Sequence, residues 1–133
     1  GMIMSFKLSI SCKNCGFEKR FTVGTSDGDN SIEAAIDQLH HMRRPKVLKL
    51  LNEHKVHVTD FDHRIYRCGA CGLLRNSFWI RIIYDDDQVY ETGFLCGKCQ
   101  RPMTQVREHH QLNNIPCPCC NVENLKVTMD NQQ

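Results

Sequence analysis

The 133-residue chain lacks several features that mark common protein classes. No apolar run approaches the roughly 18 to 20 residues that a membrane-spanning helix needs, so we expect no contact with a membrane. Nothing in the sequence resembles a secretory signal peptide, and it contains no Asn-x-Ser/Thr acceptor for N-linked glycans. Its 41% hydrophobic and 24% charged residues are typical of a folded protein rather than of a disordered one.

Motifs of several enzyme classes are also missing. The phosphate-binding pattern G-x-x-x-x-G-K-[ST] and the metalloprotease pattern H-E-x-x-H do not occur. The segment 116–120 matches the P-C-x-x-C half of the zinc-deaminase signature, but no histidine has a glutamate two residues later, as the other half requires. We therefore predict no catalytic residues and no organic cofactor, and expect a non-catalytic protein.

Cysteine is what the chain has in excess, with nine residues. Eight of them form four C-x-x-C pairs, namely Cys12 and Cys15, Cys68 and Cys71, Cys96 and Cys99, Cys117 and Cys120. Eight thiolates suffice for two tetrahedral four-cysteine metal sites, and this spacing is typical of them. The odd total and the regular spacing argue against a disulfide framework, and such thiols indicate a reducing, cytoplasmic location. Cys119, inside the fourth pair, is expected to be a small structural residue.

Four thiolates suit either zinc or iron. A rubredoxin-type electron carrier usually has one compact site near the surface, whereas this chain has ligands for two. We therefore expect two structural zinc ions and keep iron as the alternative. Because cysteine fills every ligand position, none is left for a catalytic water.

Two pairings of the C-x-x-C motifs are reasonable. In the sequential pairing, the first motif shares an ion with the second, and the third shares one with the fourth. In the nested pairing, the second meets the third, and the first meets the fourth. The 17 residues of the segment 100–116 fit the usual zinc-ribbon spacing of about 15 to 20, whereas the segment 72–95 is longer. We therefore favour the sequential pairing, and the nested one stays open.

Hydrophobic periodicity predicts strands around most of the motifs. Apolar and polar residues alternate over 6–11 before the first motif, and Phe17, Phe21 and Val23 suggest a returning strand. Further strands are expected over 78–84, 89–95 and 125–129.

Between the first two motifs the apolar spacing becomes helical. A first helix is expected after Asn30, a plausible N-cap, and a second from Pro45 to about His54. The buried side chains of the second helix are expected to be Val47, Leu48 and Leu51. We expect both helices to cover a sheet.

Strand, C-x-x-C-G, strand is the knuckle of zinc ribbons and of rubredoxin-like domains. Residues 12–16 and 68–72 carry this sequence, while the third and fourth motifs have Gln100 and Asn121 in place of glycine. The order of the four knuckles, with helices after the first, resembles a family of small uncharacterised bacterial zinc-ribbon proteins. That resemblance covers most of the chain and implies no particular activity.

The motifs, strands and helices together predict an α+β, mostly β fold with two zinc-ribbon modules. Residues 2–92 would form the first ribbon, with a helical insertion at about 30–54, and residues 93–130 the second. Residues 131–133 would be a polar tail, and Gly1 before Met2 is expected to be an added residue.

Charge offers little guidance to the partner. The formal charge of +2 becomes about −2 once eight thiolates and two divalent ions are counted, so no global basic field attracts nucleic acid. Basic residues do gather locally between His40 and Arg67. We favour a protein-binding adaptor module and keep nucleic-acid binding, through Arg43, Arg44 and Lys46, as the alternative.

Overall fold

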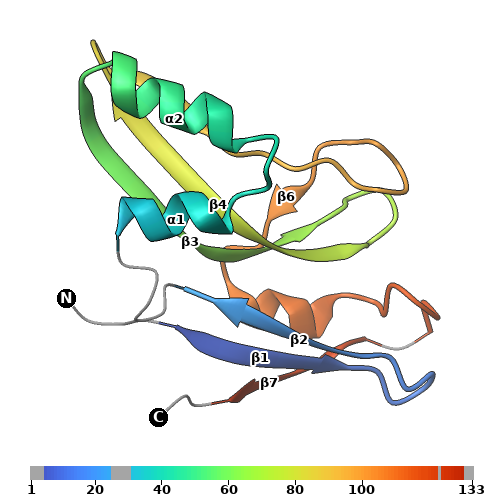
Figure 1. Ribbon diagram of the computed structural model, residues 1–133. Helices are drawn as coiled ribbons and strands as arrows, with labels where there is room; N and C mark the ends of the chain where they lie inside the picture. The colour runs from blue at the N-terminus through green and yellow to red at the C-terminus, as the bar shows by residue number, and fades with distance from the viewer. Residues whose placement is uncertain (1–4, 25–30, 123, 131–133) are drawn as a thin grey trace.

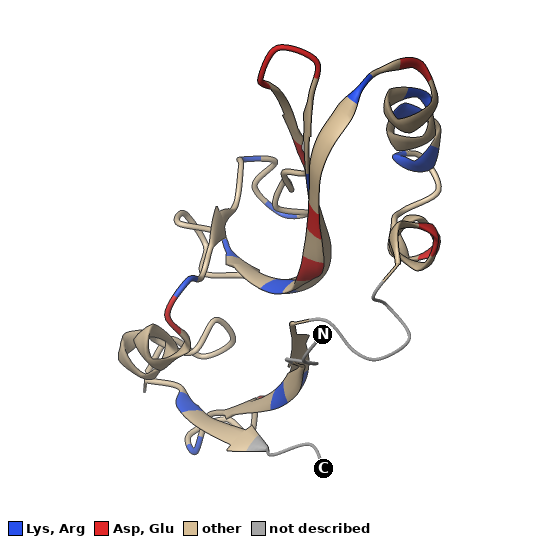
Figure 2. Cartoon of the chain, turned by 90° about the vertical axis from the view of Figure 1, so that its left-hand side faces the viewer, with Lys and Arg blue, Asp and Glu red and all other residues tan. Residues whose placement is uncertain are grey.

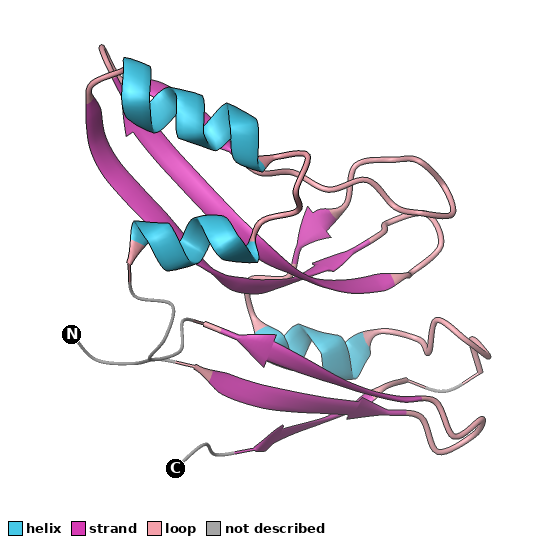
Figure 3. Ribbon diagram, in the orientation of Figure 1, coloured by secondary structure: helices cyan, strands magenta, loops and turns pink. Residues whose placement is uncertain are grey.

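Two antiparallel sheets, a pair of helices and a short 3-10 helix make up the computed structural model (Figure 1), which describes residues 5–24, 31–122 and 124–130. The elements, in chain order, are β1 (Phe6–Ser11), β2 (Glu18–Val23), α1 (Ile32–Gln38), α2 (Arg44–Glu53), β3 (Val56–Arg67), β4 (Leu74–Tyr84), β5 (Gln88–Glu91), β6 (Thr104–Gln105), the 3-10 helix η2 (His109–Asn114) and β7 (Lys126–Asp130). The expected α+β, mostly β character is confirmed (Figure 3). Among the described residues, no helix has the length and apolar character needed to cross a membrane.

The first sheet joins the two ends of the described chain, in the strand order β2-β1-β7. Leu8 on the central strand lies opposite Phe21 on β2 and Met129 on β7. Leu8, Ile10 and Phe21 are almost fully buried, because alternate residues of a strand point to the same face. The predicted strands at both ends are therefore present and share one sheet.

The second sheet has the order β5-β4-β3-β6, and both helices lie on one of its faces (Figures 1 and 2). Ala35 of α1 and Val47 and Leu50 of α2 pack in one cluster with Phe78 and Ile80 of β4. The expectation that the helices cover a sheet is thus confirmed. On the other face, Asp60, Asp62 and Arg64 of β3 pair with Arg81, Trp79 and Ser77 of β4 in the strand register.

Two details of the helices differ from the sequence-based expectation. Asn30 lies outside the described residues, and Ser31 caps α1, its side-chain oxygen accepting a hydrogen bond from the Ala34 amide at 3.1 Å. In α2, Leu50 is buried beside Val47, whereas Leu48 is 44% exposed. Residues three apart share a helix face, while Leu48 is turned about 100° away from Val47.

Asn76 of β4 connects the two sheets. Its side-chain oxygen accepts a hydrogen bond from the Thr22 amide at 2.8 Å, and its amide nitrogen donates to the carbonyls of Thr22 at 2.8 Å and Arg64 at 3.1 Å. Gly24 and His63 exchange two backbone hydrogen bonds of 2.9 Å close by. The second sheet therefore supplies hydrogen-bond partners for the backbone at the β2 edge of the first sheet.

Asn76→Ala should lower the free energy of unfolding by about 1 to 3 kcal/mol, because it removes the partners of the Thr22 amide and carbonyl. Urea denaturation of the metal-loaded protein measures this loss. Asn52→Ala, at an exposed position of α2, is the matched control and should be nearly silent. Equal urea midpoints for the two variants would show that Asn76 does not hold the sheets together.

Candidate metal centre

All four C-x-x-C motifs adopt the same backbone turn. In each, the amide of the residue after the second cysteine donates to the carbonyl of the first cysteine, at 2.8 to 3.0 Å. That residue has a positive φ in every case: 78° at Gly16, 80° at Gly72 and 60° at both Gln100 and Asn121. The loss of glycine from the third and fourth motifs therefore leaves the knuckle geometry intact. The Gln100 side-chain amide also donates to the Gly97 carbonyl at 3.2 Å.

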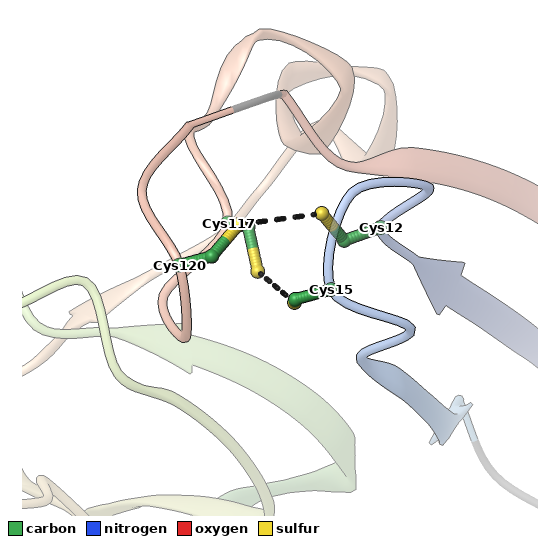
Figure 4. Close-up of side chains that lie close together, drawn as sticks. All are labelled: Cys12, Cys15, Cys117 and Cys120. Atoms are coloured by element: carbon green, nitrogen blue, oxygen red, sulfur yellow. Dashed lines mark hydrogen bonds between the residues drawn. The ribbon is translucent and has the colours of Figure 1, made fainter.

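The knuckles meet in two groups of four sulfurs. Within each group the four sulfur atoms all lie within 4.8 Å of one another. The first group contains Cys12, Cys15, Cys117 and Cys120, and the second contains Cys68, Cys71, Cys96 and Cys99. Figure 4 shows the first group, in which the side chains of the first and last knuckles point toward one another.

This arrangement is the nested one, so the favoured sequential pairing is wrong. The physical reason is the strand pairing of the first sheet: β7 lies beside β1, which brings the last knuckle to the first. The third knuckle instead follows β5, the partner of β4, and returns to the second. Both sulfur groups therefore span the expected boundary between residues 92 and 93, and those domain limits stay a prediction.

The sulfur separations suit one tetrahedral ion per group. A zinc–sulfur bond of about 2.3 Å gives a tetrahedron with edges of about 3.8 Å. Cys12 and Cys120 lie 3.6 Å apart, and so do Cys71 and Cys96. All nine cysteines are free thiols, and these separations far exceed the roughly 2.05 Å of a disulfide bond. Both groups can therefore hold a metal ion, and zinc and iron both fit.

Backbone amides also prepare the sulfurs for the thiolate form. The Cys71 amide donates to the Cys68 sulfur at 3.5 Å, and this bond helps to lower the pKa of Cys68 to about 6. In the same group, a hydrogen bond with Cys71 raises the pKa of Cys99 to about 12. Without a cation, neighbouring thiols thus oppose the loss of all four protons, because like charges repel. A divalent ion would remove this conflict.

The first cysteine of each knuckle is buried, which links the sulfur groups to the protein core. Cys68, Cys96 and Cys117 have no exposed surface, and Cys12 is 3% exposed. Cys12 and Cys117 belong to the same apolar cluster as Leu8. The first sulfur group is therefore continuous with the core of the first sheet.

Cys119 lies outside both sulfur groups. Its side chain is exposed, while its backbone amide donates to the Cys117 sulfur at 3.3 Å. It therefore acts on the centre through its backbone, whatever its side chain.

Comparisons of the chain with protein-family models, with curated proteins and with solved structures found no match. The two four-cysteine groups support a metal-binding, zinc-ribbon-like arrangement on geometry alone.

The nested pairing predicts the metal content of paired substitutions. Cys12→Ser with Cys117→Ser damages one group and should leave one ion per chain. Cys12→Ser with Cys68→Ser damages both groups, so metal content should fall well below one ion per chain. Elemental analysis of the purified proteins checks both values. The sequential pairing requires the reverse result, and Cys119→Ser is the control that should keep two ions.

Proposed function

We propose that this chain is a non-catalytic protein in which two structural zinc centres hold a docking site for a protein partner. The all-cysteine ligand sets support the structural role, since they leave no position for substrate or water. Structural zinc contributes about 10 to 16 kcal/mol of apparent folding free energy at neutral pH in small domains.

A slot between the knuckles is the observation that carries the proposed docking role. The cavity has a volume of about 210 Å³ and is lined by residues from or beside all four knuckles. Phe17 follows the first, Leu73 the second, Lys98 lies within the third and Pro118 within the fourth. The slot therefore takes its shape from both sulfur groups and depends on both ions.

The lining indicates the chemistry of the partner. Phe17, Leu73, Leu74 and Pro118 offer an apolar surface suited to one bulky apolar side chain. The exposed Lys98 supplies a positive charge at the same place. A peptide segment with a large apolar residue beside acidic residues complements both features.

The alternative of nucleic-acid binding through the α2 region has less support. Arg44 donates to the carbonyls of Leu39 at 3.0 Å and Asp37 at 2.9 Å, and so holds the end of α1. The Arg43 guanidinium lies 5.0 Å from the Phe94 ring centre and donates to the Gly93 carbonyl. Both arginines thus serve the fold, which leaves Lys46 as the exposed cation of the three.

Metal identity separates the structural role from electron transfer. We expect colourless protein with two zinc ions per chain when it is purified without added metal. Absorbance spectra and elemental analysis measure this. A red protein with ferric thiolate bands would favour the rubredoxin-like alternative instead.

Leu73→Asp should weaken the binding of peptides selected for the slot. We would select a random phage-displayed peptide library on the zinc-loaded protein and measure the enriched peptides by calorimetry. They should share a large apolar residue with acidic neighbours, because these match the lining and Lys98. Leu73→Asp should weaken their binding at least about tenfold, since it places a charge in an apolar slot.

The control is Val122→Asp, which changes an exposed valine that does not line the slot and should keep the affinity. Both variants must bind two zinc ions for the comparison to count. Failure to enrich any such peptide, or equal affinity for the parent protein and Leu73→Asp, would contradict the docking role. Neither result would bear on the proposal that the zinc ions are structural.

A further inference from the structure

The face of the second sheet that the helices leave free carries a second cavity, which is lined mainly by charged residues, unlike the apolar slot. Its volume is about 350 Å³, and the charged residues at its lining are evenly divided between three arginines and three acids. The lining residues are Asp60, Phe61, Asp62, Arg64, Trp79, Arg81, Glu91 and Arg107. Figure 2 shows the helices on the other side of this sheet. The cavity is therefore a polar site that the zinc centres and the slot do not involve.

Arg64 forms a fixed flat surface in this cavity. Its guanidinium carbon lies 3.3 Å from the centre of the Trp79 ring, so the two groups are stacked. The Asp62 carboxylate accepts a hydrogen bond from Arg64 Nε at 2.5 Å, and the Gln105 side-chain oxygen accepts one from Nη1 at 3.1 Å. The Arg64 side chain is only 23% exposed. Trp79 covers one face of the guanidinium, and Arg64 lines the cavity together with this ring.

Arg81 and Arg107 supply two other guanidinium groups at the cavity. Within the described part of the chain, the side chain of neither arginine makes a hydrogen bond or an ion pair. Arg81 is opposite Asp60 on β3 and Glu91 on β5 in the strand register, yet forms no ion pair with either. Unused guanidinium groups beside a cavity suit phosphate or carboxylate, which they bind through two parallel hydrogen bonds.

The acidic residues offer acceptors for the opposite end of a ligand. Asp60 has no cationic partner among the described residues. Glu91 accepts a hydrogen bond from the indole nitrogen of Trp79 at 2.8 Å, which fixes its carboxylate and leaves further acceptor capacity. Such carboxylates take hydrogen bonds from amino groups on the edges of nucleobases.

We propose that this cavity binds a nucleoside monophosphate unit whose base carries an amino group, either as a free nucleotide or within a single strand. The base stacks on the Arg64 guanidinium, as bases do on arginine planes in RNA complexes. Its amino group donates to Asp60 or Glu91, and the phosphate binds Arg81 and Arg107. This function goes beyond the zinc-dependent docking role and uses different residues.

The balance of charges distinguishes this ligand from simpler ones. Inorganic phosphate would engage the two free arginines but neither the flat surface nor the carboxylates. A free amino acid has both charges but no ring to stack. Because the cavity's arginines and acids cancel, long-range attraction is weak, and affinity rests on stacking and short hydrogen bonds.

The test is a titration of the zinc-loaded protein with GMP, UMP and inorganic phosphate. Calorimetry measures affinity, and emission from Trp79, the single tryptophan, reports on the Arg64 guanidinium that it contacts. GMP should bind at least about tenfold more tightly than UMP, which lacks an amino group, and than phosphate. Equal affinity for GMP and phosphate, or no saturable binding at millimolar ligand, would overturn the proposal.

Variants locate the site. Arg81→Gln should weaken GMP binding at least about tenfold, and Arg64→Lys should do the same because it keeps the charge but removes the flat surface. Lys46→Gln on α2 is the matched control and should bind GMP normally. Unchanged binding to Arg81→Gln, or an equal loss in Lys46→Gln, would place any binding elsewhere and overturn the proposal.

A single-stranded oligoguanylate of eight nucleotides separates the two sources of ligand. Affinity well above that of GMP, again lost in Arg81→Gln, supports a nucleotide within a strand. Equal affinity supports a free nucleotide. In every variant, two bound zinc ions and an unchanged circular dichroism spectrum confirm that the fold is kept.

Discussion

Four sulfurs held within 4.8 Å of one another are the constraint on which the rest of the fold depends. As thiolates the four sulfurs would repel one another, and a divalent ion bound among them would offset this repulsion. The first group joins Cys12 to Cys120 and Cys15 to Cys117, across 108 and 102 residues of sequence. An ion bound there would hold β7 beside β1 and so close the first sheet.

The second group acts more locally, but the two groups are coupled through the packing around them. The knuckles supply the slot between Phe17, Leu73 and Pro118, and Cys12 and Cys117 belong to the apolar cluster of the first sheet. An isolated two-stranded hairpin is at best marginally stable in water, so β1 and β2 depend on β7 as the third strand of their sheet. Metal binding to the first group, closure of the first sheet and formation of the slot should therefore occur as one cooperative event. The second sulfur group holds the other side of the slot, which includes Leu73 and Lys98.

Local chemistry was predictable from the sequence, and long-range pairing was not. The C-x-x-C spacing predicted four knuckles, and asparagine's tolerance of positive φ agreed with the 60° at Asn121. The spacing rule for shared ions failed, because it describes loops and takes no account of which strands pair. Similarly, helical spacing predicted α2, but the choice of Leu50 over Leu48 as a buried residue depends on where the sheet lies.

The strand β3 escaped prediction for a reason that bears on function. An antiparallel sheet can leave one face to solvent, and its strands then alternate apolar and polar residues. In β3, Asp60, Asp62 and Arg64 lie on the face away from the helices. Their charges make the apolar residues Phe61 and Ile65 of the same strand hard to recognise as a strand pattern in the sequence. Solubility alone would be met by any polar residues here. It does not require a guanidinium stacked at 3.3 Å on a nearly buried tryptophan, or an Arg81 side chain without a partner among the described residues. Departures from a simple pattern gather at functional sites, because binding a ligand imposes demands that folding does not. The same residues that obscure the strand in the sequence are therefore the ones that build the cavity.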